Sequence, residues 1–419
     1  MDTGSDIGNA RPPLMSGYRA LDLTDPQGYV CGMFLAELGF EVIKVENPDG
    51  DPGRLRYPFI GGIPDKEKGI YWNSFNVDKK GITLNLETEK GRSIFMELVK
   101  KSDVVIESFE PGYLDSLGLG YEELNKVNPR IILTSITPFG QDTSRRNYKG
   151  GELICDALAG VMDNIGDEDR APLIEPADTC TFYANIAAAT GTITALYAAN
   201  LQGEGQHVDV SIEEAAASRN PQGEMSWIFD RKIAKRMGPY SKYGIAKVRT
   251  VWECKDGFVN WTLFAGRMGA KGNSALCAWM NEDGLENPLN AIEDWNNFDM
   301  SSMTEKDLDH WEMCIARFFR NHTKKELGEE GAKRNLSATI LAGPDDMLGN
   351  EHLNSRGYWT ELEGPDRTVL PHPKYCLLSS ETENYTKKRA PFLGEDNEKV
   401  YKELGLKASL KDLKAEGVI

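Results

Sequence analysis

Asp178 is the residue in this sequence with the clearest potential for chemistry. It follows Pro176 and precedes a long helical pattern that begins at Thr179. An aspartate at a helix N-terminus is most often a cap, whose carboxylate accepts backbone N–H groups of the first turn. The same position keeps a carboxylate ionised, and an ionised carboxylate can attack an activated carbonyl such as a thioester. Because capping aspartates greatly outnumber nucleophilic ones, the residues alone favour the cap.

A glycine-rich stretch in the second half of the chain also invites a functional interpretation. It contains Gly266, Gly269 and Gly272, together with two cations. The pattern fits either a flexible surface connection or a lid whose N–H groups meet an acyl oxygen or a phosphate, and both interpretations stay open. The cation pairs Lys79–Lys80 and Arg145–Arg146 are most simply solvated charges, although one pair is a candidate for phosphate contacts.

Other common chemistries lack the residues that they need. The turn from Asp22 to Gly28 has no glycine fingerprint, which argues against a nicotinamide or flavin enzyme. Ser and His never form a nucleophile-elbow pattern, so a serine hydrolase is disfavoured. The seven cysteines and five histidines are dispersed without ligand spacing, and we expect no metal site.

Composition limits the partners and the compartment. The 419 residues include 48 basic and 65 acidic side chains, and the formal charge of -17 repels nucleic acid. No apolar run approaches the ~20 residues of a membrane span, and the acidic N-terminus is no signal peptide. The absence of any Cys-x-x-Cys pair is typical of reduced thiols. We therefore expect a cytoplasmic protein that contacts neither membrane nor nucleic acid.

The first half of the chain alternates strand and helix patterns. Short apolar strands are expected over 19–23, 41–46, 82–86, 102–107, 130–136 and 207–211, with helices over 30–38, 88–101 and 121–127. This alternation predicts a parallel sheet covered by helices on both faces, which is an α/β fold.

Changes in composition and sequence pattern divide the chain into four parts. Residues 1–220 are expected to form the first part of a large domain, and the basic, irregular stretch 221–248 a linker. Residues 249–341 carry most of the Trp and Met and predict a smaller α+β domain. The loop-rich segment 342–419 is expected to return to the large domain and complete it.

A series of short motifs carries a resemblance to a known family. In order, they are Leu21-Asp22-Leu23-Thr24, Leu35 to Glu46, Phe75 to Gly81, Ser102 to Gly112, Asn128-Pro129-Arg130, Pro138-Phe139-Gly140-Gln141, Pro176-Ala177-Asp178, Gly205 to Ser211 and Pro391 to Gly394. Together they span about Tyr18 to Leu406. In their order and spacing the chain resembles the class III CoA-transferases of the CaiB/BaiF type, which include formyl-CoA, carnitine and benzylsuccinate CoA-transferases.

The resemblance implies a mechanism and an assembly. It places Asp178 at the family's catalytic aspartate, which forms a mixed anhydride and then an aspartyl-CoA thioester. CoA thioesters are the expected substrates, with succinyl-CoA a candidate donor, and no tightly bound cofactor, nucleotide or metal is required. The fold implied is a Rossmann-like large domain with a smaller domain, in two chains interlocked like linked rings. Gln27, Lys79, Phe109 and Phe139 are assigned to the CoA pocket, and the stretch from Gly266 to Gly272 resembles a glycine-rich lid.

Departures from the family pattern bear on the assembly. Ser108 and Glu110 replace a donor and a cation, while Pro48 and Ser116 stand where some members carry Arg. Glu152 and Asp156 occupy positions where Asp and Gln are usual. Losing cations weakens contacts with an anionic cofactor. The chain is therefore either a homodimer that holds CoA with other basic residues or a subunit paired with a paralogue, as in the benzylsuccinate transferases.

Three functions follow from the sequence. The first is transfer of CoA to an organic acid, with an aromatic dicarboxylate such as benzylsuccinate as the suggested acceptor. The second is an acyl-CoA racemase, which needs an acid/base pair and has only His207 as a weak candidate. The third is a non-catalytic subunit, in which Asp178 is merely a helix cap.

Overall fold

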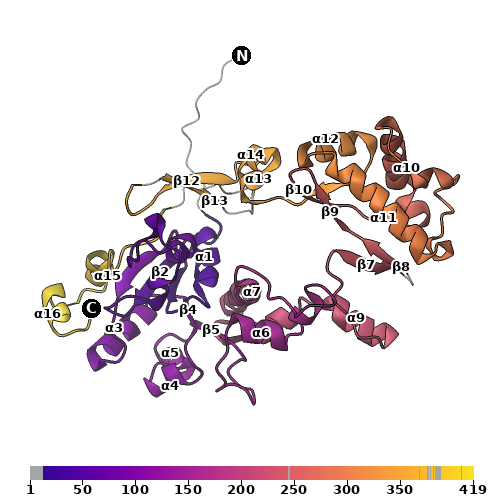
Figure 1. Ribbon diagram of the computed structural model, residues 1–419. Coiled ribbons are helices and arrows are strands. Elements are labelled where there is room, and N and C mark those ends of the chain that lie inside the picture. Colours follow the sequence, from indigo (N-terminus) through magenta and orange to yellow (C-terminus); the bar gives the residue numbers. More distant parts are fainter. Residues whose placement is uncertain are drawn as a thin grey trace. The chain divides into compact units, whose positions relative to one another are not determined.

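The computed structural model describes residues 13–243, 246–367, 369–374, 377, 379–380, 382, 388–406 and 408–419 (Figure 1). The chain divides into two compact units. The first comprises Met1–Met162, Ile174–Ile233 and His352–Ile419, and the second comprises Asp163–Leu173 and Ala234–Glu351.

The first unit is built on a six-stranded parallel sheet. Its strands are β1 (Arg19–Asp22), β2 (Glu41–Glu46), β3 (Lys80–Thr83), β4 (Val104–Glu107), β5 (Ile132–Thr137) and β6 (His207–Ser211). They lie in the order β3-β2-β1-β4-β5-β6, and every neighbouring pair is parallel. This is the Rossmann strand order. The predicted α/β class and parallel sheet are confirmed.

Helices cover both faces of this sheet, as buried parallel strands require. On one face, α1 (Tyr29–Glu37), α7 (Thr179–Gln202) and α8 (Ile212–Ala217) share a core with apolar residues of β1, β4 and β5. On the other face, α3 (Glu89–Val99) and α5 (Tyr121–Val127) pack on the alternate residues of the same strands. All residues of β4 and β5 are buried.

The third strand lies two residues earlier than expected. Residues 82–86 carry an apolar pattern, but the ladder with β2 pairs Lys80 to Thr83 and ends there. The chain then turns at Asn85 so that Thr88 can cap α3, its hydroxyl accepting the N–H of Gly91 at 3.0 Å.

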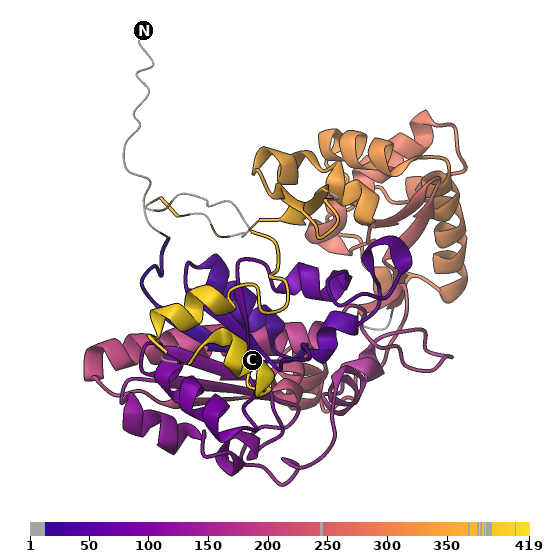
Figure 2. The ribbon, with the colours of Figure 1, turned by 90° about the vertical axis from the view of Figure 1, so that its left-hand side faces the viewer.

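The C-terminal segment completes the first unit. Helices α15 (Asn397–Glu403) and α16 (Leu410–Ala415) lie beside α3 (Figures 1 and 2), and Val400, Tyr401 and Leu413 join its core. The Tyr401 hydroxyl donates to the carbonyl oxygen of Thr83 at 2.5 Å. A region more than 300 residues away in sequence thus secures the edge of the sheet.

The remaining elements of the first unit are short. They are η1 (Pro52–Leu55), η2 (Ile60–Gly62), α2 (Ile70–Phe75), α4 (Tyr113–Ser116), α6 (Glu152–Leu158), α9 (Pro221–Asp230), the hairpin β12 (Trp359–Glu363) with β13 (Val369–Pro373), and most of α14 (Glu351–Ser355). The short helix η3 (Met162–Asn164) spans a boundary between the units.

The second unit combines small antiparallel sheets with helices. Strands β9 (Val251–Cys254), β10 (Gly257–Asn260) and β11 (Thr339–Ile340) pair antiparallel, as do β7 (Tyr240–Tyr243) and β8 (Ala246–Arg249). The helices are α10 (Gly266–Glu282), α11 (Glu305–Arg320), α12 (Lys324–Arg334), α13 (Pro344–Leu348), η4 (Pro288–Ala291) and η5 (Met300–Ser302). Five buried tryptophans dominate its core: Trp252, Trp261, Trp279, Trp295 and Trp311.

The segment 221–248 differs from the irregular linker that we expected. It carries α9, which belongs to the first unit, and the β7–β8 hairpin, which belongs to the second. Within the described residues, no helix is long and apolar enough to span a bilayer.

Candidate active site

Asp178 stands at the N-cap position of α7 in an unusual backbone conformation. Its φ and ψ are 52° and 45°, and the preceding Ala177 has a φ of 66°. Side chains with a Cβ rarely adopt this left-handed region, and such residues cluster at functional sites. The Asp178 carboxylate makes no capping hydrogen bond. The cap interpretation of Asp178 is therefore wrong in this structure.

Glu152 supplies the cap that Asp178 does not. Its two carboxylate oxygens accept the backbone N–H groups of Cys180 at 2.7 Å and Thr181 at 2.9 Å, and the Thr181 hydroxyl at 2.7 Å. Neighbouring Asp156, also on α6, accepts the Cys180 thiol at 3.1 Å. Both departures from the family pattern therefore hold the start of α7. Because Glu152 satisfies the helix terminus, the Asp178 carboxylate is left for other work.

Two side chains contact the Asp178 carboxylate. The Arg56 guanidinium forms an ion pair and hydrogen bond with it. Tyr71 lies beside them: the guanidinium carbon of Arg56 stacks 4.0 Å from the ring centroid. Burial, and then the charge of Asp178, raise the pKa of the Tyr71 hydroxyl, which keeps it a neutral donor. The site therefore holds a carboxylate, a cation and a hydroxyl.

A second arginine anchors the loop that carries Arg56. Arg54 is fully buried and binds Glu46 through two hydrogen bonds, of 2.6 and 2.8 Å. Its guanidinium stacks on Trp72 at 3.8 Å, one residue beyond Tyr71. Bidentate pairs of this kind fix both position and orientation. The Arg54–Trp72 stack thus fixes the two segments that carry Arg56 and Tyr71.

Lys79, which we assigned to the CoA pocket, lies in the core of the sheet. Its ammonium donates to Asp22 at 2.8 Å, to the carbonyl oxygen of Tyr29 at 2.9 Å and to Asn76 at 2.8 Å. Three partners use all three donors of an ammonium group. Burial alone would raise the pKa of Asp22, but the charges of Lys79 and Lys44 lower it. In this structure Lys79 neutralises Asp22 and has no donor left for a phosphate.

Gln27 and Phe109 lie at the point in the sheet where ligands of this fold class bind. Gln27 follows β1 and Phe109 follows β4, the two adjacent strands at which the strand order reverses. Ser108 ties the two loops together, because its hydroxyl accepts the N–H of Asp25 and donates to the Asp25 carboxylate, both at 2.8 Å. In open α/β sheets, ligands bind beyond the carboxyl ends of the strands at this switch point.

Contacts connect this switch point to Asp178. The Tyr71 hydroxyl donates to the carbonyl oxygen of Pro26 at 3.3 Å, and Asn185 on α7 donates to the carbonyl oxygen of Gln27 at 2.7 Å. The side-chain oxygen of Gln27 is buried and has no hydrogen-bond partner within the described residues. Buried polar atoms usually have one, so this oxygen fits a donor on a bound ligand. These contacts join the Pro26–Gln27 backbone to Tyr71 and to α7, the helix that Asp178 precedes.

Phe139 and the three glycines occupy other surroundings. Phe139 is 5% exposed and packs in the core with α1 and α7. Gly266, Gly269 and Gly272 lie in α10, so the expected loop is a helix. Gly269 is needed for packing, since a Cβ there would lie 2.0 Å from the carbonyl oxygen of Phe264. Beyond the first turn, helical N–H groups bond within the helix and cannot serve a ligand.

Charge around Phe109 is mixed. Glu110 pairs with Lys149, and the Arg146 guanidinium lies beside Gly112, 3.3 Å from where a Cβ would stand. Phe109, Pro111 and Tyr113 line a hollow at this place. Burial raises the pKa of Glu107, at the end of β4, to about 7. Arg146 is thus a cation near the hollow, although the family cation is absent at Glu110.

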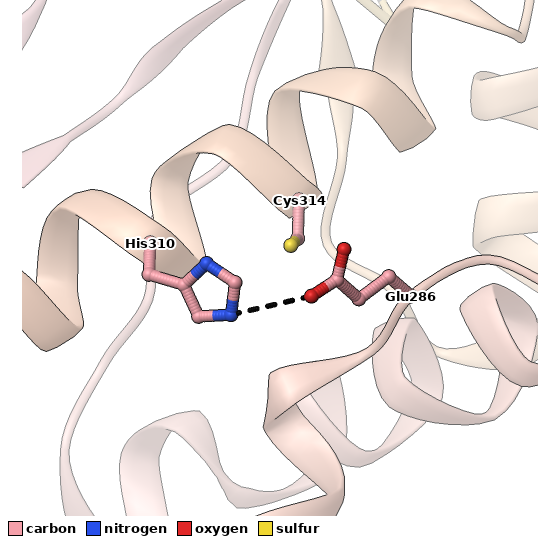
Figure 3. Close-up of side chains that lie close together, drawn as sticks. All are labelled: Glu286, His310 and Cys314. Carbon is pink, nitrogen blue, oxygen red and sulfur yellow. Dashed lines mark ion pairs between the residues drawn. The ribbon is translucent and has the colours of Figure 1, made fainter.

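One cluster in the second unit has the residue types of a metal site. The ligand atoms of Glu286, His310 and Cys314 all lie within 4.8 Å of one another (Figure 3). Figure 3 shows His310 facing Glu286, with their closest atoms 3.6 Å apart. Burial raises the pKa of the Cys314 thiol, which keeps it protonated at neutral pH. Glu286 and His310 are exposed, and the Cys314 thiol beside them is buried.

Comparisons with known proteins agree with this geometry. The profile described as CoA-transferase family III matches residues 15–397. The chain belongs to CoA-transferase family III. It is 31% identical over 395 residues to succinyl-CoA:(R)-benzylsuccinate CoA-transferase subunit BbsE of Thauera aromatica, covering 94% of this chain and 95% of that protein.

Other relatives of this family III CoA-transferase support the same assignment. A succinate–glutarate CoA-transferase of Agrobacterium fabrum is 28% identical over 408 residues, covering 96% of this chain and 98% of that protein. The crystal structure of a CAIB/BAIF family protein from Brucella suis aligns with a TM-score of 0.81 and 26% identity, over 94% of this chain and all of that one. The chain is therefore a CoA-transferase, and CoA thioesters are its substrates.

Sequence reasoning missed Arg56 and Tyr71. The available signals were the two arginines of Arg54-Leu55-Arg56 and the adjacent aromatic residues Tyr71 and Trp72. Arg54 stacks on Trp72, and Arg56 stacks on Tyr71. Nothing in the sequence shows that these two segments meet near Asp178. The weak racemase candidate His207 instead contacts Ser135 of β5 at 2.9 Å and stacks on Tyr121.

Proposed function

We propose that this family III CoA-transferase moves CoA from a donor acyl-CoA such as succinyl-CoA to an organic acid, with Asp178 as the covalent nucleophile. The observation that carries the proposal is the separation of roles at α7. Glu152 caps the helix, whereas Asp178 is held in a left-handed conformation against Arg56 and Tyr71. If Asp178 only capped α7, its carboxylate would accept backbone N–H groups of the first turn, and it does not.

The first half of the reaction loads CoA onto Asp178. A carboxylate oxygen of Asp178 attacks the thioester carbonyl of the donor, a C–O bond forms, and the C–S bond breaks to release CoA thiolate. The thiolate then attacks the aspartyl carbonyl of the mixed anhydride. The bond from that carbonyl carbon to the bridging oxygen breaks, and the donor acid leaves as a carboxylate.

The second half returns along the same path with the acceptor. The acceptor carboxylate attacks the aspartyl thioester, and the thiolate released attacks the acceptor carbonyl of the new anhydride. This yields acceptor-CoA and the Asp178 carboxylate. Bonds of equal energy are exchanged, so the steps need no nucleotide, no redox partner and no net proton transfer. None of these steps has a role for a tightly bound cofactor.

The relatives suggest the class of acceptor. Two of their names specify succinyl-CoA with benzylsuccinate or mesaconate, and a third names succinate with glutarate. All of these acids are dicarboxylic acids. A dicarboxylate acceptor is therefore proposed, with an aromatic one such as benzylsuccinate favoured by the aromatic rings near Asp178. One is the ring of Tyr71, which stacks on Arg56. The other belongs to Phe182, one helical turn after Asp178, whose backbone N–H donates to the Asp178 carbonyl oxygen at 2.9 Å.

Assembly with a second chain, as an interlocked homodimer or with a paralogue, is part of the proposal. Helix α9 exposes Met225, Trp227, Ile228 and Phe229, with the Phe229 side chain 76% accessible. Contiguous apolar side chains of this size mark interaction surfaces. Light scattering of the protein expressed alone is expected to give twice the chain mass for a homodimer. A monomer would instead require the paralogue.

An exchange reaction tests the covalent mechanism. The protein, with any co-purifying partner, is incubated with succinyl-CoA and labelled succinate, without another acceptor. A ping-pong enzyme passes label into succinyl-CoA through the Asp178 thioester. We expect this exchange in the wild type and its loss in Asp178→Asn. Equal exchange in both proteins would overturn the nucleophile.

A further inference from the structure

Arg56 differs from its buried neighbour Arg54 in one respect that matters for substrates. Both guanidinium groups stack on an aromatic ring, at 4.0 Å on Tyr71 and 3.8 Å on Trp72. The Arg54 side chain is fully buried and bound to Glu46, whereas the Arg56 side chain is 40% exposed. Arg54 is therefore fixed by the fold, whereas Arg56 is accessible enough to exchange Asp178 for another carboxylate.

The ion pair of Arg56 with Asp178 is suited to such an exchange. A pair exposed to this degree contributes only about 0–1 kcal/mol to stability, so opening it requires little free energy. Within the described residues, Asp178 is the hydrogen-bond partner of one Arg56 nitrogen, and a guanidinium carries five N–H donors in a planar fork. Stacking on Tyr71 fixes the plane of that fork.

The covalent chemistry at Asp178 changes the charge that Arg56 faces. An ionised carboxylate carries one negative charge, but an aspartyl thioester carries none. Once Asp178 holds CoA, the cation beside it has lost its counter-ion. The acid substrate of the second half-reaction is itself a carboxylate, and it must approach the carbonyl that Arg56 adjoins. A guanidinium binds such a carboxylate with the geometry that it uses for Asp178.

We propose that Arg56 is the carboxylate-binding residue of this site. It pairs with Asp178 in the resting enzyme and with the reacting carboxylate of the acid substrate when Asp178 is a thioester. This inference rests on the proposed function, because it needs the thioester to free the guanidinium. The substrate class that it defines is any carboxylate anion small enough to reach Asp178, whereas a neutral nucleophile has no need of Arg56.

That difference supplies the test. Wild type, Arg56→Gln and Arg56→Lys are compared in two reactions of the full protein with succinyl-CoA. One is exchange with labelled succinate, and the other is trapping by hydroxylamine, a nucleophile that is neutral at pH 7.5. For Arg56→Gln we expect a 10- to 100-fold higher KM for succinate and hydroxamate formation within threefold of wild type. The Lys variant should fall between them, because it keeps the charge but not the fork.

Two controls separate this effect from folding. Arg320→Gln removes an exposed arginine paired with Glu253 at 2.9 Å in the second unit, and it should leave both reactions unchanged. Thermal melting of each variant verifies that it is folded.

The outcomes distinguish this inference from the proposed function. If hydroxamate forms but Arg56→Gln has an unchanged KM for succinate, Arg56 is not the carboxylate receptor, and the nucleophile assignment survives. If Arg56→Gln is folded yet forms no hydroxamate, Arg56 serves the first step and the inference is wrong. If the wild type forms no hydroxamate on Asp178, the proposed function fails first.

Discussion

The Glu152 carboxylate accepts the backbone N–H of Cys180 at 2.7 Å, inside the first turn of the helix that Asp178 precedes. Because Glu152 caps α7, the Asp178 carboxylate is not needed for the stability of the helix. Glu152 performs the structural task that sequence position assigns to Asp178. The two carboxylates should therefore respond oppositely to substitution.

Asp178→Asn should retain stability and lose activity. Asparagine tolerates the left-handed conformation as well as aspartate does, but its amide is not a nucleophile. We expect a melting temperature within about 2 °C of wild type and transfer reduced at least ~10³-fold. Calorimetry and a transfer assay measure the two effects. Substantial residual transfer would show that Asp178 is dispensable.

Glu152→Ala is the matched variant and should lose stability first. It removes the acceptor of two backbone N–H groups at the start of α7, and losing a cap costs about 0.5–2 kcal/mol. Urea unfolding should therefore show a lower free energy of unfolding than that of Asp178→Asn. If Glu152→Ala were as stable as wild type, the capping role of Glu152 would be refuted.

Lys79→Met should destabilise the fold without weakening the binding of CoA by the folded protein. It leaves the buried Asp22 carboxylate without its closest cation, and breaking a buried pair costs about 3–5 kcal/mol. Lys80→Met, which removes only the partly exposed pair with Glu41, is the control and should cost about 1 kcal/mol or less. Denaturant unfolding and CoA titration measure the two properties. A tenfold weaker CoA affinity with unchanged stability would restore Lys79 to the CoA pocket.

Glu107→Gln should gain stability relative to wild type as pH rises. Burial raises the pKa of Glu107 to about 7, against about 4.3 in an unfolded chain. Between these values the folded protein holds a proton that the unfolded chain has lost, so the free energy of unfolding falls as pH rises. Glutamine removes this dependence.

The pH series should therefore show little difference at pH 4.5 and an advantage of about 1–3 kcal/mol for Glu107→Gln at pH 8. Glu110→Gln, which removes an exposed carboxylate three residues further along the chain, serves as the control for the substitution itself. An advantage that did not grow with pH would mean that Glu107 is ionised in the folded protein at low pH.

Arg146→Gln should raise the KM for succinyl-CoA about 3- to 10-fold with little change in kcat, the effect of one lost charge contact. Its guanidinium lies beside Gly112, next to the hollow that Phe109 and Tyr113 line. The wild-type KM should also rise more steeply with salt than that of the variant, because a charge contact is screened. Arg320→Gln, far from Phe109 in sequence, is the control. An unchanged KM would show that the CoA phosphates lie elsewhere.

Sequence patterns predicted the sheet well because each strand is a local signal. Strand residues such as Ile132, Leu133 and Ile136 are buried on the two faces of the sheet, and their apolar side chains indicate that burial directly. Local signals failed where a contact joins distant segments. Lys79 reads as a surface cation until Asp22, more than 50 residues earlier, is seen to neutralise it.

At the site, too, local motifs were predictive, whereas contacts between distant segments were not predicted. Family motifs located Asp178, yet its backbone conformation and its freedom from the cap depend on Glu152 of another helix. Arg56 reaches Asp178 across 122 positions, a separation that no spacing rule covers. The glycines from Gly266 to Gly272 predicted a loop because glycine weakens helices, but packing against Phe264 favours the helix all the same.

Trapping the acyl-enzyme tests the central claim most directly. The protein, with any partner that co-purifies, is incubated with succinyl-CoA and hydroxylamine, and the masses of the peptides around Asp178 are measured. The account predicts a hydroxamate on Asp178, and none on this peptide when succinyl-CoA is left out. An unmodified Asp178 in a preparation that actively transfers CoA would contradict it and assign catalysis to another residue or to the partner.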